Sequence, residues 1–216
     1  LDLITKPLGA RFKVGPFDIE YVTVTHSIPE PNALLIRTRH GTVVHTGDFK
    51  VDPEPLLGTA TDEAKLRAAG DAGVLALVCD STNATLEGKT GSEVQVRDSL
   101  TELISRFHQR VAVACFASNL ARITSLYHAA VANRRRVALI GRSLWRYTEV
   151  ARSCGYLEDI PPFLTEHDAA RLPAERTLLI CTGSQGEPGS ALARIAAREH
   201  QHVRFDPRSE EHTSEL

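Results

Sequence analysis

Three short runs of mostly β-branched and aliphatic residues each end at a side chain able to bind or orient a metal ion. The runs Tyr21–Thr25, Thr42–Gly47 and Val74–Cys79 are followed by His26, Asp48 and Asp80. Runs of this length and composition predict strands, and polar groups at strand ends can converge on one rim of a sheet. The pattern indicates a metal site for which this chain supplies only part of the ligands.

The first part of the chain predicts a β-rich unit. We expect strands at Arg11–Val14, Asp18–Thr25, Asn32–Arg39 and Thr42–Thr46, then a short helix at Asp62–Ala69 before a strand that begins at Val74. The dipeptides Gly15-Pro16 and His40-Gly41 are placed to turn two hairpins.

After about Ser92 the pattern changes to alternating strands and helices. Apolar strands are expected at Val111–Phe116, Val137–Ile140 and Thr177–Cys181, and helices begin near the candidate N-caps Ser92, Ser118, Ser143 and Ser190. Continuous apolar strands that alternate with helices are typical of a parallel sheet covered on both faces. We therefore predict an α/β fold in two units, residues 1–86 and 87–207.

Residues 208–216 have no apolar period and read like a translated sequencing adapter. We expect them to be a non-native tail outside the fold. No signal peptide is visible at the start of the chain. The chain contains no Met, not even at its first position, so we expect that its natural N-terminus is missing.

Composition limits the setting. No apolar stretch reaches the roughly 18 residues of a membrane span. None of the four cysteines, Cys79, Cys115, Cys154 and Cys181, forms a C-x-x-C pair, which favours core residues in a reduced, cytoplasmic protein. The net charge of −2 leaves an RNA partner open, because the distribution of charge matters more than its sum.

Spacing alone gives a weak functional signal. Neutral imidazole and carboxylate suit zinc, and carboxylate-rich sites also admit manganese or magnesium. A His at a strand end is nevertheless more often structural, and Asp48, which follows Thr46-Gly47, could be a turn residue. Asp80 could equally be a cap or turn residue.

Six segments carry a combined signal in their order along the chain: Thr25–Glu30, His45–Lys50, Asp80–Ala84, Phe116–Asn119, Gly141–Ser143 and Ile180–Pro188. Together they resemble segments of the ribonuclease J family, which belongs to the β-CASP branch of the metallo-β-lactamase superfamily. The resemblance covers nearly all of residues 1–207 and implies a partial metallo-β-lactamase αββα sandwich followed by most of a β-CASP α/β domain.

The resemblance also implies roles for individual residues. His26 would be a metal ligand, Asp48 would bridge two divalent ions, and Asp80 would orient a catalytic or ligand His. The implied activity is metal-dependent ribonuclease action, 5′-to-3′ exonucleolytic with endonuclease cleavage also possible, in RNA processing and decay. Zinc is the implied metal, RNA the partner, and a homodimer the implied assembly.

RNA-binding side chains are expected just beyond the carboxyl ends of the parallel strands, where ligands bind in open α/β sheets. The candidates are Ser118, Asn119, Arg142, Ser143, Ser184 and Gln185. Each Ser could instead be a plain helix cap. The cluster Arg134–Arg136 follows a helix, and we expect it to be a solvated group at the helix end.

Two departures from the family pattern are as informative as the resemblance. The H-x-H-x-D-H motif is absent, and neither His200 nor His202 has the setting of the family's C-terminal β-CASP histidines. We therefore expect this chain to be an internal fragment that is inactive alone. The rival interpretations are a non-catalytic RNA-binding or assembly protein and a metallo-β-lactamase-type hydrolase of small esters or thioesters. A nucleotide-dependent enzyme would need a phosphate loop that the sequence lacks.

Overall fold

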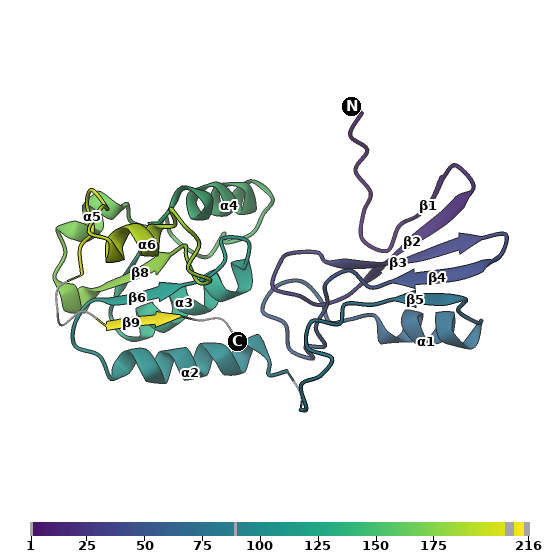
Figure 1. Cartoon of the computed structure of the whole chain (residues 1–216), viewed down its shortest axis with the longest axis horizontal. Helices are drawn as coiled ribbons and strands as arrows, with labels where there is room; N and C mark the ends of the chain where they lie inside the picture. The colour runs from purple at the N-terminus through teal and green to yellow at the C-terminus, as the bar shows by residue number, and fades with distance from the viewer. Residues whose placement is uncertain (1, 89, 206–209, 214–216) are drawn as a thin grey trace. The chain divides into compact units, whose positions relative to one another are not determined.

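Two stretches of different hydrophobic pattern fold into two compact units, Leu1–Glu93 and Val94–Leu216. The computed structural model describes residues 2–88, 90–205 and 210–213 (Figure 1). The sequence placed the boundary at residue 86, a few residues earlier. The assignment of the units to a partial metallo-β-lactamase domain and a β-CASP domain stays a prediction.

The first unit is built on a five-stranded sheet of order β1-β2-β3-β4-β5. Its strands are β1 (Arg11–Val14), β2 (Phe17–Thr23), β3 (Asn32–Thr38), β4 (Gly41–His45) and β5 (Ala76–Val78). The first four pair antiparallel through short connections, and the β1–β2 and β3–β4 hairpins are the two that the turn signals predict. Strand β5 lies parallel to β4, with Val44 opposite Leu77.

One helix supports this sheet. The side chain of Asp62 caps helix α1 (Glu63–Asp71) by accepting a hydrogen bond from the Lys65 amide at 3.0 Å. Leu66 and Ala69 of α1 pack against a small core formed by Val22, Val24, Ala33, Leu35 and Val44. Strand β5 differs from expectation because all its residues are exposed, including Leu77 at 62%. It forms one edge of the sheet, and β1 forms the other.

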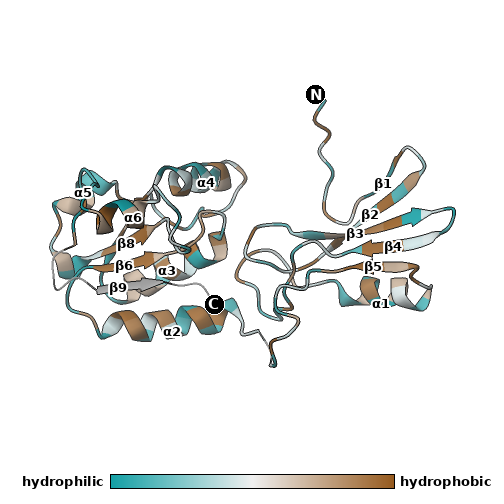
Figure 2. Ribbon diagram, viewed as in Figure 1, coloured by the Kyte–Doolittle hydropathy of each residue, from teal (hydrophilic) through white to brown (hydrophobic). Residues whose placement is uncertain are grey.

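The second unit contains a sheet of order β7-β8-β6-β9 in which the strands run parallel. The strands are β6 (Val111–Ala114), β7 (Arg136–Ile140), β8 (Thr177–Cys181) and β9 (Glu210–Thr213). The three that the sequence predicts are almost entirely buried, and β6 and β8 are hydrophobic along their length in Figure 2.

Helices lie on both faces of this sheet, as the alternation predicts. They are α2 (Glu93–Ser105), α3 (Leu120–Ala132), α4 (Arg142–Ser153), α5 (Glu166–Ala170) and α6 (Ala191–Ala196), with a short 3-10 turn at Ala174–Arg176. On one face Ala169 of α5 and Leu192 and Ile195 of α6 pack against Ala138 and Leu179. Helix α3 contacts β7 and β8 from the other face (Figure 1).

Two helix caps differ from the sequence prediction by one or two positions. Asn119, not Ser118, caps α3, and its side-chain oxygen accepts a hydrogen bond from the Arg122 amide at 2.9 Å. Gly141, not Ser143, precedes α4 and offers no side-chain cap. Ser190 caps α6 as predicted.

Three further expectations need correction. Backbone atoms of Glu210–Thr213, within the segment 208–216 that we expected outside the fold, pair with β6 as β9, since the open edge of β6 offers unpaired N–H and C=O groups. Cys115 and Cys181 are buried as expected, whereas Cys79 and Cys154 are exposed in loops that follow β5 and α4. Arg135 is buried rather than solvated.

None of the helices in the described residues combines the length and apolarity needed to cross a bilayer.

Candidate functional site

His26 follows the end of β2 by three residues and is held there by its neighbour. The chain leaves β2 through Val24, whose amide donates to the Pro31 carbonyl at 3.1 Å, and Thr25 then forms an isolated antiparallel bridge with Lys50. The imidazole of His26 is half-buried, and its Nδ1 lies 3.1 Å from the hydroxyl of Ser27. The ring is therefore fixed at one nitrogen by a local contact.

Asp48 lies in the turn that follows β4. Gly47 has a φ of +61°, a left-handed conformation that glycine adopts without strain, and its amide donates to Nδ1 of His45 at 3.1 Å. This turn leaves Asp48 exposed to solvent. The side chain is accessible to a ligand.

Asp80 follows β5 and is tied to the same turn. Its amide donates to the hydroxyl of Thr46 at 3.1 Å, and its carboxylate accepts hydrogen bonds from the hydroxyl and amide of Thr82 at 2.6 and 2.9 Å. These bonds from Thr82 lower the pKa of Asp80, and the charge of His26 and the amide of Phe49 lower it further. The structure therefore brings Asp80 near His26 and near the residue after Asp48.

The described residues do not complete a metal site. Across 2–88, 90–205 and 210–213, no three His, Cys, Asp or Glu side chains come close enough together to hold a metal ion. Zinc in proteins takes three or four protein ligands. His26 and Asp48 are therefore short of the donor set that a metal ion needs, and the residues that the structure describes do not fit a dinuclear centre by themselves.

The six candidate RNA-binding residues all follow the carboxyl ends of β6, β7 and β8. Ser118 and Asn119 follow β6, Arg142 and Ser143 begin α4 directly after β7, and Ser184 and Gln185 follow β8. Because β8 lies between the other two strands, these loops form one polar rim. Gln185 is exposed, and its amide lies 3.3 Å from the Glu187 carboxylate.

Two glycines bring the backbones of this rim close together. A Cβ on Gly141 would lie 2.8 Å from the Thr182 hydroxyl oxygen, and a Cβ on Gly183 would lie 2.5 Å from that of Ser190. Both distances are shorter than real side chains allow. The rim is therefore packed tightly at β7 and β8.

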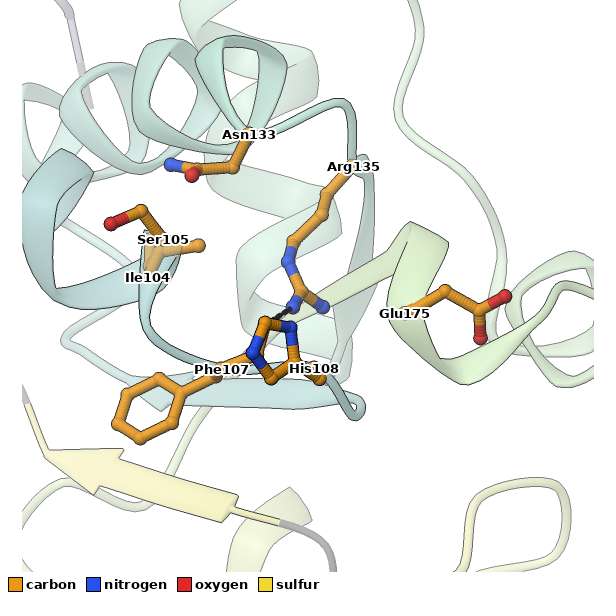
Figure 3. A pocket seen from close by; sticks show the side chains of 7 residues that line it. All are labelled: Ile104, Ser105, Phe107, His108, Asn133, Arg135 and Glu175. Atoms are coloured by element: carbon orange, nitrogen blue, oxygen red, sulfur yellow. Dashed lines mark hydrogen bonds between the residues drawn. The ribbon is translucent and has the colours of Figure 1, made fainter.

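A cavity of about 380 Å³ lies at the opposite, amino end of the same strands and contains none of the candidate site residues (Figure 3). Its lining includes His108, Asn133, Arg135 and Glu175. The Arg135 guanidinium donates to the carbonyls of Phe107 at 2.5 Å, Gln109 at 2.7 Å and Thr177 at 3.1 Å. These bonds give Arg135 a structural role, because its charge is already used to join three backbone segments.

Sequence reasoning missed the threonines that hold the candidate site together. Thr25 joins the His26 segment to Lys50, and Thr46 joins the Asp48 turn to Asp80. Their only signal in the sequence is that each lies at the end of an apolar run, one or two residues before a candidate ligand.

Comparison of the sequence with a family model and with curated proteins points in each case to ribonuclease J. Residues 108–210 match the family described as "Ribonuclease J, beta-CASP domain". The chain is 52% identical over 197 residues to ribonuclease J of Sinorhizobium meliloti, which covers 91% of this chain and 35% of that protein. It is 45% identical over 190 residues to ribonuclease J of Corynebacterium glutamicum, covering 88% and 26%. With ribonuclease J of Thermus thermophilus it shares 41% over 198 residues, covering 91% and 35%.

The chain thus spans about a third or less of the length of the curated relatives that it matches. A solved crystal structure of a protein of unknown function from Enterococcus faecalis V583 shares the fold, with a TM-score of 0.60 at 16% sequence identity. That match covers 98% of this chain and 57% of the other chain.

Proposed function

We propose, on the premise that this chain belongs to the ribonuclease J family, that it supplies part of the active site and part of the RNA-binding surface of a metal-dependent ribonuclease. The observation that carries the proposal is the approach of His26, the Asp48 turn and Asp80 in one unit. Their order along the chain is the order in which the family resemblance assigns their roles.

The β-CASP ribonuclease J family is metal-dependent. We assign His26 and Asp48 as metal ligands and Asp80 as the carboxylate that orients a neighbouring imidazole. Two divalent ions are proposed, with zinc as the first candidate and manganese or magnesium as alternatives. Because the described residues hold no three-donor group, the remaining ligands have to come from outside them.

The polar rim of the second unit is the proposed RNA-binding surface. It carries Ser118, Asn119, Arg142, Ser143, Ser184 and Gln185 at the carboxyl ends of the parallel strands. Single-stranded RNA is commonly held by basic and polar groups along its backbone. Since the side-chain oxygen of Asn119 already caps α3, this residue is left with its amide N–H groups for RNA.

The proposed activity is 5′-to-3′ exonucleolytic, with endonuclease cleavage as a second mode, in rRNA processing and RNA decay in the cytoplasm. A homodimer is the proposed assembly. The 216 residues alone are expected to be inactive, because the H-x-H-x-D-H motif is not among them.

The proposal can be tested in a segment-swap chimera. Residues of this chain replace the aligned segment of ribonuclease J from Sinorhizobium meliloti, to which they are 52% identical. The chimera is expected to degrade 5′-monophosphorylated single-stranded RNA. Asp48→Ala should lower the rate by about 100-fold or more, since a charge that holds metal ions is lost.

Asp98→Ala is the matched control, because Asp98 is an exposed carboxylate on α2, far along the chain from the site. It should leave the rate unchanged. Turnover by the Asp48→Ala chimera equal to that of the parent chimera would remove Asp48 from the active site.

The absence of a three-donor group in the described residues favours a second candidate, a non-catalytic RNA-binding protein of the same fold. It predicts that the 216-residue chain binds single-stranded RNA and that the chimera is inactive even when folded. Hydrolysis by the chimera would exclude it.

A further inference from the structure

Thr25 has a partner for every one of its polar atoms, and the partners lie on two other segments. Its hydroxyl donates to the Lys50 carbonyl and accepts from the Asp52 amide at 3.1 Å. Its carbonyl accepts from the Lys50 amide at 2.8 Å, and its own amide donates to the hydroxyl of Thr61 at 3.1 Å. With 3% of its surface exposed, the side chain makes these bonds away from water.

This arrangement connects two of the proposed active-site residues over a short path. His26 is bonded directly to Thr25, and Asp48 precedes Lys50 by two residues. A displacement of Thr25 relative to Lys50 therefore changes the separation of His26 and Asp48.

The segment Lys50–Asp52, to which Thr25 is hydrogen-bonded, is also held by contacts with other residues. Asp52 is buried at 4% exposure, and its carboxylate accepts hydrogen bonds from the amides of Glu54 at 3.0 Å and Glu93 at 3.1 Å. Its carboxylate also lies 3.4 Å from Nζ of Lys50. A segment held at both sides cannot absorb a shift at Thr25 by local bending alone.

We propose that Thr25 is a positioning residue whose hydroxyl sets the placement of Asp48 relative to His26 for RNA hydrolysis. The expected effect on the rate of hydrolysis rests on the proposed function. The expected effect of Thr25 on the position of Asp48 concerns this chain alone. A valine at this position keeps the shape of the side chain and removes the hydroxyl's bonds to Lys50 and Asp52 and its 3.3 Å contact with the Thr61 hydroxyl. The Lys50 carbonyl and the Asp52 amide then lose buried partners, which displaces the segment that leads back to Asp48.

The effect on the position of Asp48 is tested on the full 216-residue chain by NMR. In Thr25→Val, hydrogen exchange at the Asp52 amide should become about tenfold faster, because its acceptor is gone. The decisive signals are the amide and carboxyl resonances of Asp48, which is neither mutated nor adjacent to Thr25. They should shift in Thr25→Val and return in Thr25→Ser.

Thr38→Val is the matched control. The hydroxyl of Thr38 also makes two hydrogen bonds, to the Gly41 carbonyl and from the His40 amide, each at 3.0 Å, but at the turn between β3 and β4. It should leave the Asp48 resonances in place. Thr61→Ala removes the acceptor of the Thr25 amide and the 3.3 Å contact between the two threonine hydroxyls, but it keeps the bonds from Thr25 to Lys50 and Asp52. It is a milder variant for the case that Thr25→Val does not fold, and it should shift Asp48 in the same direction.

The rate is measured in the segment-swap chimera. Thr25→Val should lower kcat by about 10- to 100-fold with little change in KM, because misplaced reacting groups cost rate rather than binding. Thr25→Ser should restore most of the loss. Unmoved Asp48 resonances in both Thr25→Val and Thr61→Ala, or in whichever of them folds, would overturn the inference while leaving the proposed function standing. An inactive parent chimera would overturn the proposed function, and with it the effect on rate.

Discussion

At the scale of single residues, Arg135 shows how one buried charge joins loops that are distant in sequence. The carbonyls that it binds precede β6 and begin β8, at Phe107, Gln109 and Thr177. Lysine carries the same charge but presents it as a point rather than a planar fork, so it cannot reach three carbonyls in these directions.

Arg135→Lys is therefore expected to destabilise the second unit by about 1–3 kcal/mol, the cost of leaving buried acceptors without a donor. Urea unfolding followed by residue-resolved hydrogen exchange measures the effect. Arg136→Lys is the control, since Arg136 is exposed. Equal unfolding midpoints for the two variants would show that the carbonyl contacts contribute no stability.

His200 is buried, and its contacts favour the neutral imidazole. Its Nδ1 accepts hydrogen bonds from the amides of His202 at 3.4 Å and Val203 at 3.2 Å, and its Nε2 lies 3.0 Å from the Glu166 carboxylate. Burial is the main cause that lowers its pKa, and the charges of Arg194 and His202 lower it further against the opposing effect of Glu166.

Because the pKa of His200 is lower in the folded state, the unfolded chain binds the proton more readily below about pH 6.5. The contribution of His200 to stability is therefore present above that pH and is lost as the pH falls toward the folded pKa. Urea midpoints between pH 8 and 5 should fall more steeply for the natural chain than for His200→Gln. Parallel pH profiles would contradict this account.

At the scale of elements, a rim glycine explains how the chain after β8 can lie close against the start of α6. Gly183 has a φ of +118°, and a Cβ there would lie 2.5 Å from the Ser190 hydroxyl oxygen. Gly186, in the same loop, has a φ of +70° with open space around it.

Alanine substitutions at Gly186 and Gly183 distinguish the cost of backbone strain from the cost of a steric clash. Gly186→Ala should cost about 1 kcal/mol for the left-handed conformation alone. Gly183→Ala should cost about 2 kcal/mol more, because α6 or the rim has to move. Thermal unfolding of the two variants measures the difference, and equal melting temperatures would mean that the loop relaxes freely.

The elements themselves were largely predictable from the sequence. Strands β6, β7 and β8 are buried on both faces, so each is a continuous apolar run that needs no tertiary information to recognise. The caps were less predictable, because Ser118 and Asn119 are both good capping residues and only the geometry of the turn after β6 selects Asn119.

The candidate site was predictable in part for a similar reason. His26, Asp48 and Asp80 follow strands, so their approach at a rim could be inferred from the pattern. The contacts of Thr25 with Lys50 and Thr61 depend on how three loops cross, and nothing local in the sequence encodes that crossing. The burial of Arg135 could not be predicted either, because it stands between two arginines, Arg134 and Arg136, that are exposed as a charged cluster is expected to be.

At the scale of the whole molecule, each unit has its own hydrophobic core. The cluster around Leu35 contains only residues of the first unit, and the cluster around Leu179 contains only residues of the second. A cavity made in one core should therefore weaken that unit first.

Leu35→Ala is expected to destabilise the first unit by about 2–5 kcal/mol, since Leu35 is 1% exposed. Residue-resolved hydrogen exchange should show faster exchange in β2, β3 and β4 and unchanged exchange in β6 and β8. Equal acceleration in both units would show that the chain unfolds as one cooperative body.

The one parallel pairing of the first sheet, between β4 and β5, has a consequence for the order of folding. Strands β1 to β4 meet their neighbours through short connections, whereas β5 can pair with β4 only after residues 46–75 have closed into a loop that includes α1. Closing a long loop costs entropy before any contact repays it. Because Asp80 follows β5, we expect this carboxylate to reach His26 and the Asp48 turn only when β5 pairs with β4, after the antiparallel strands have met.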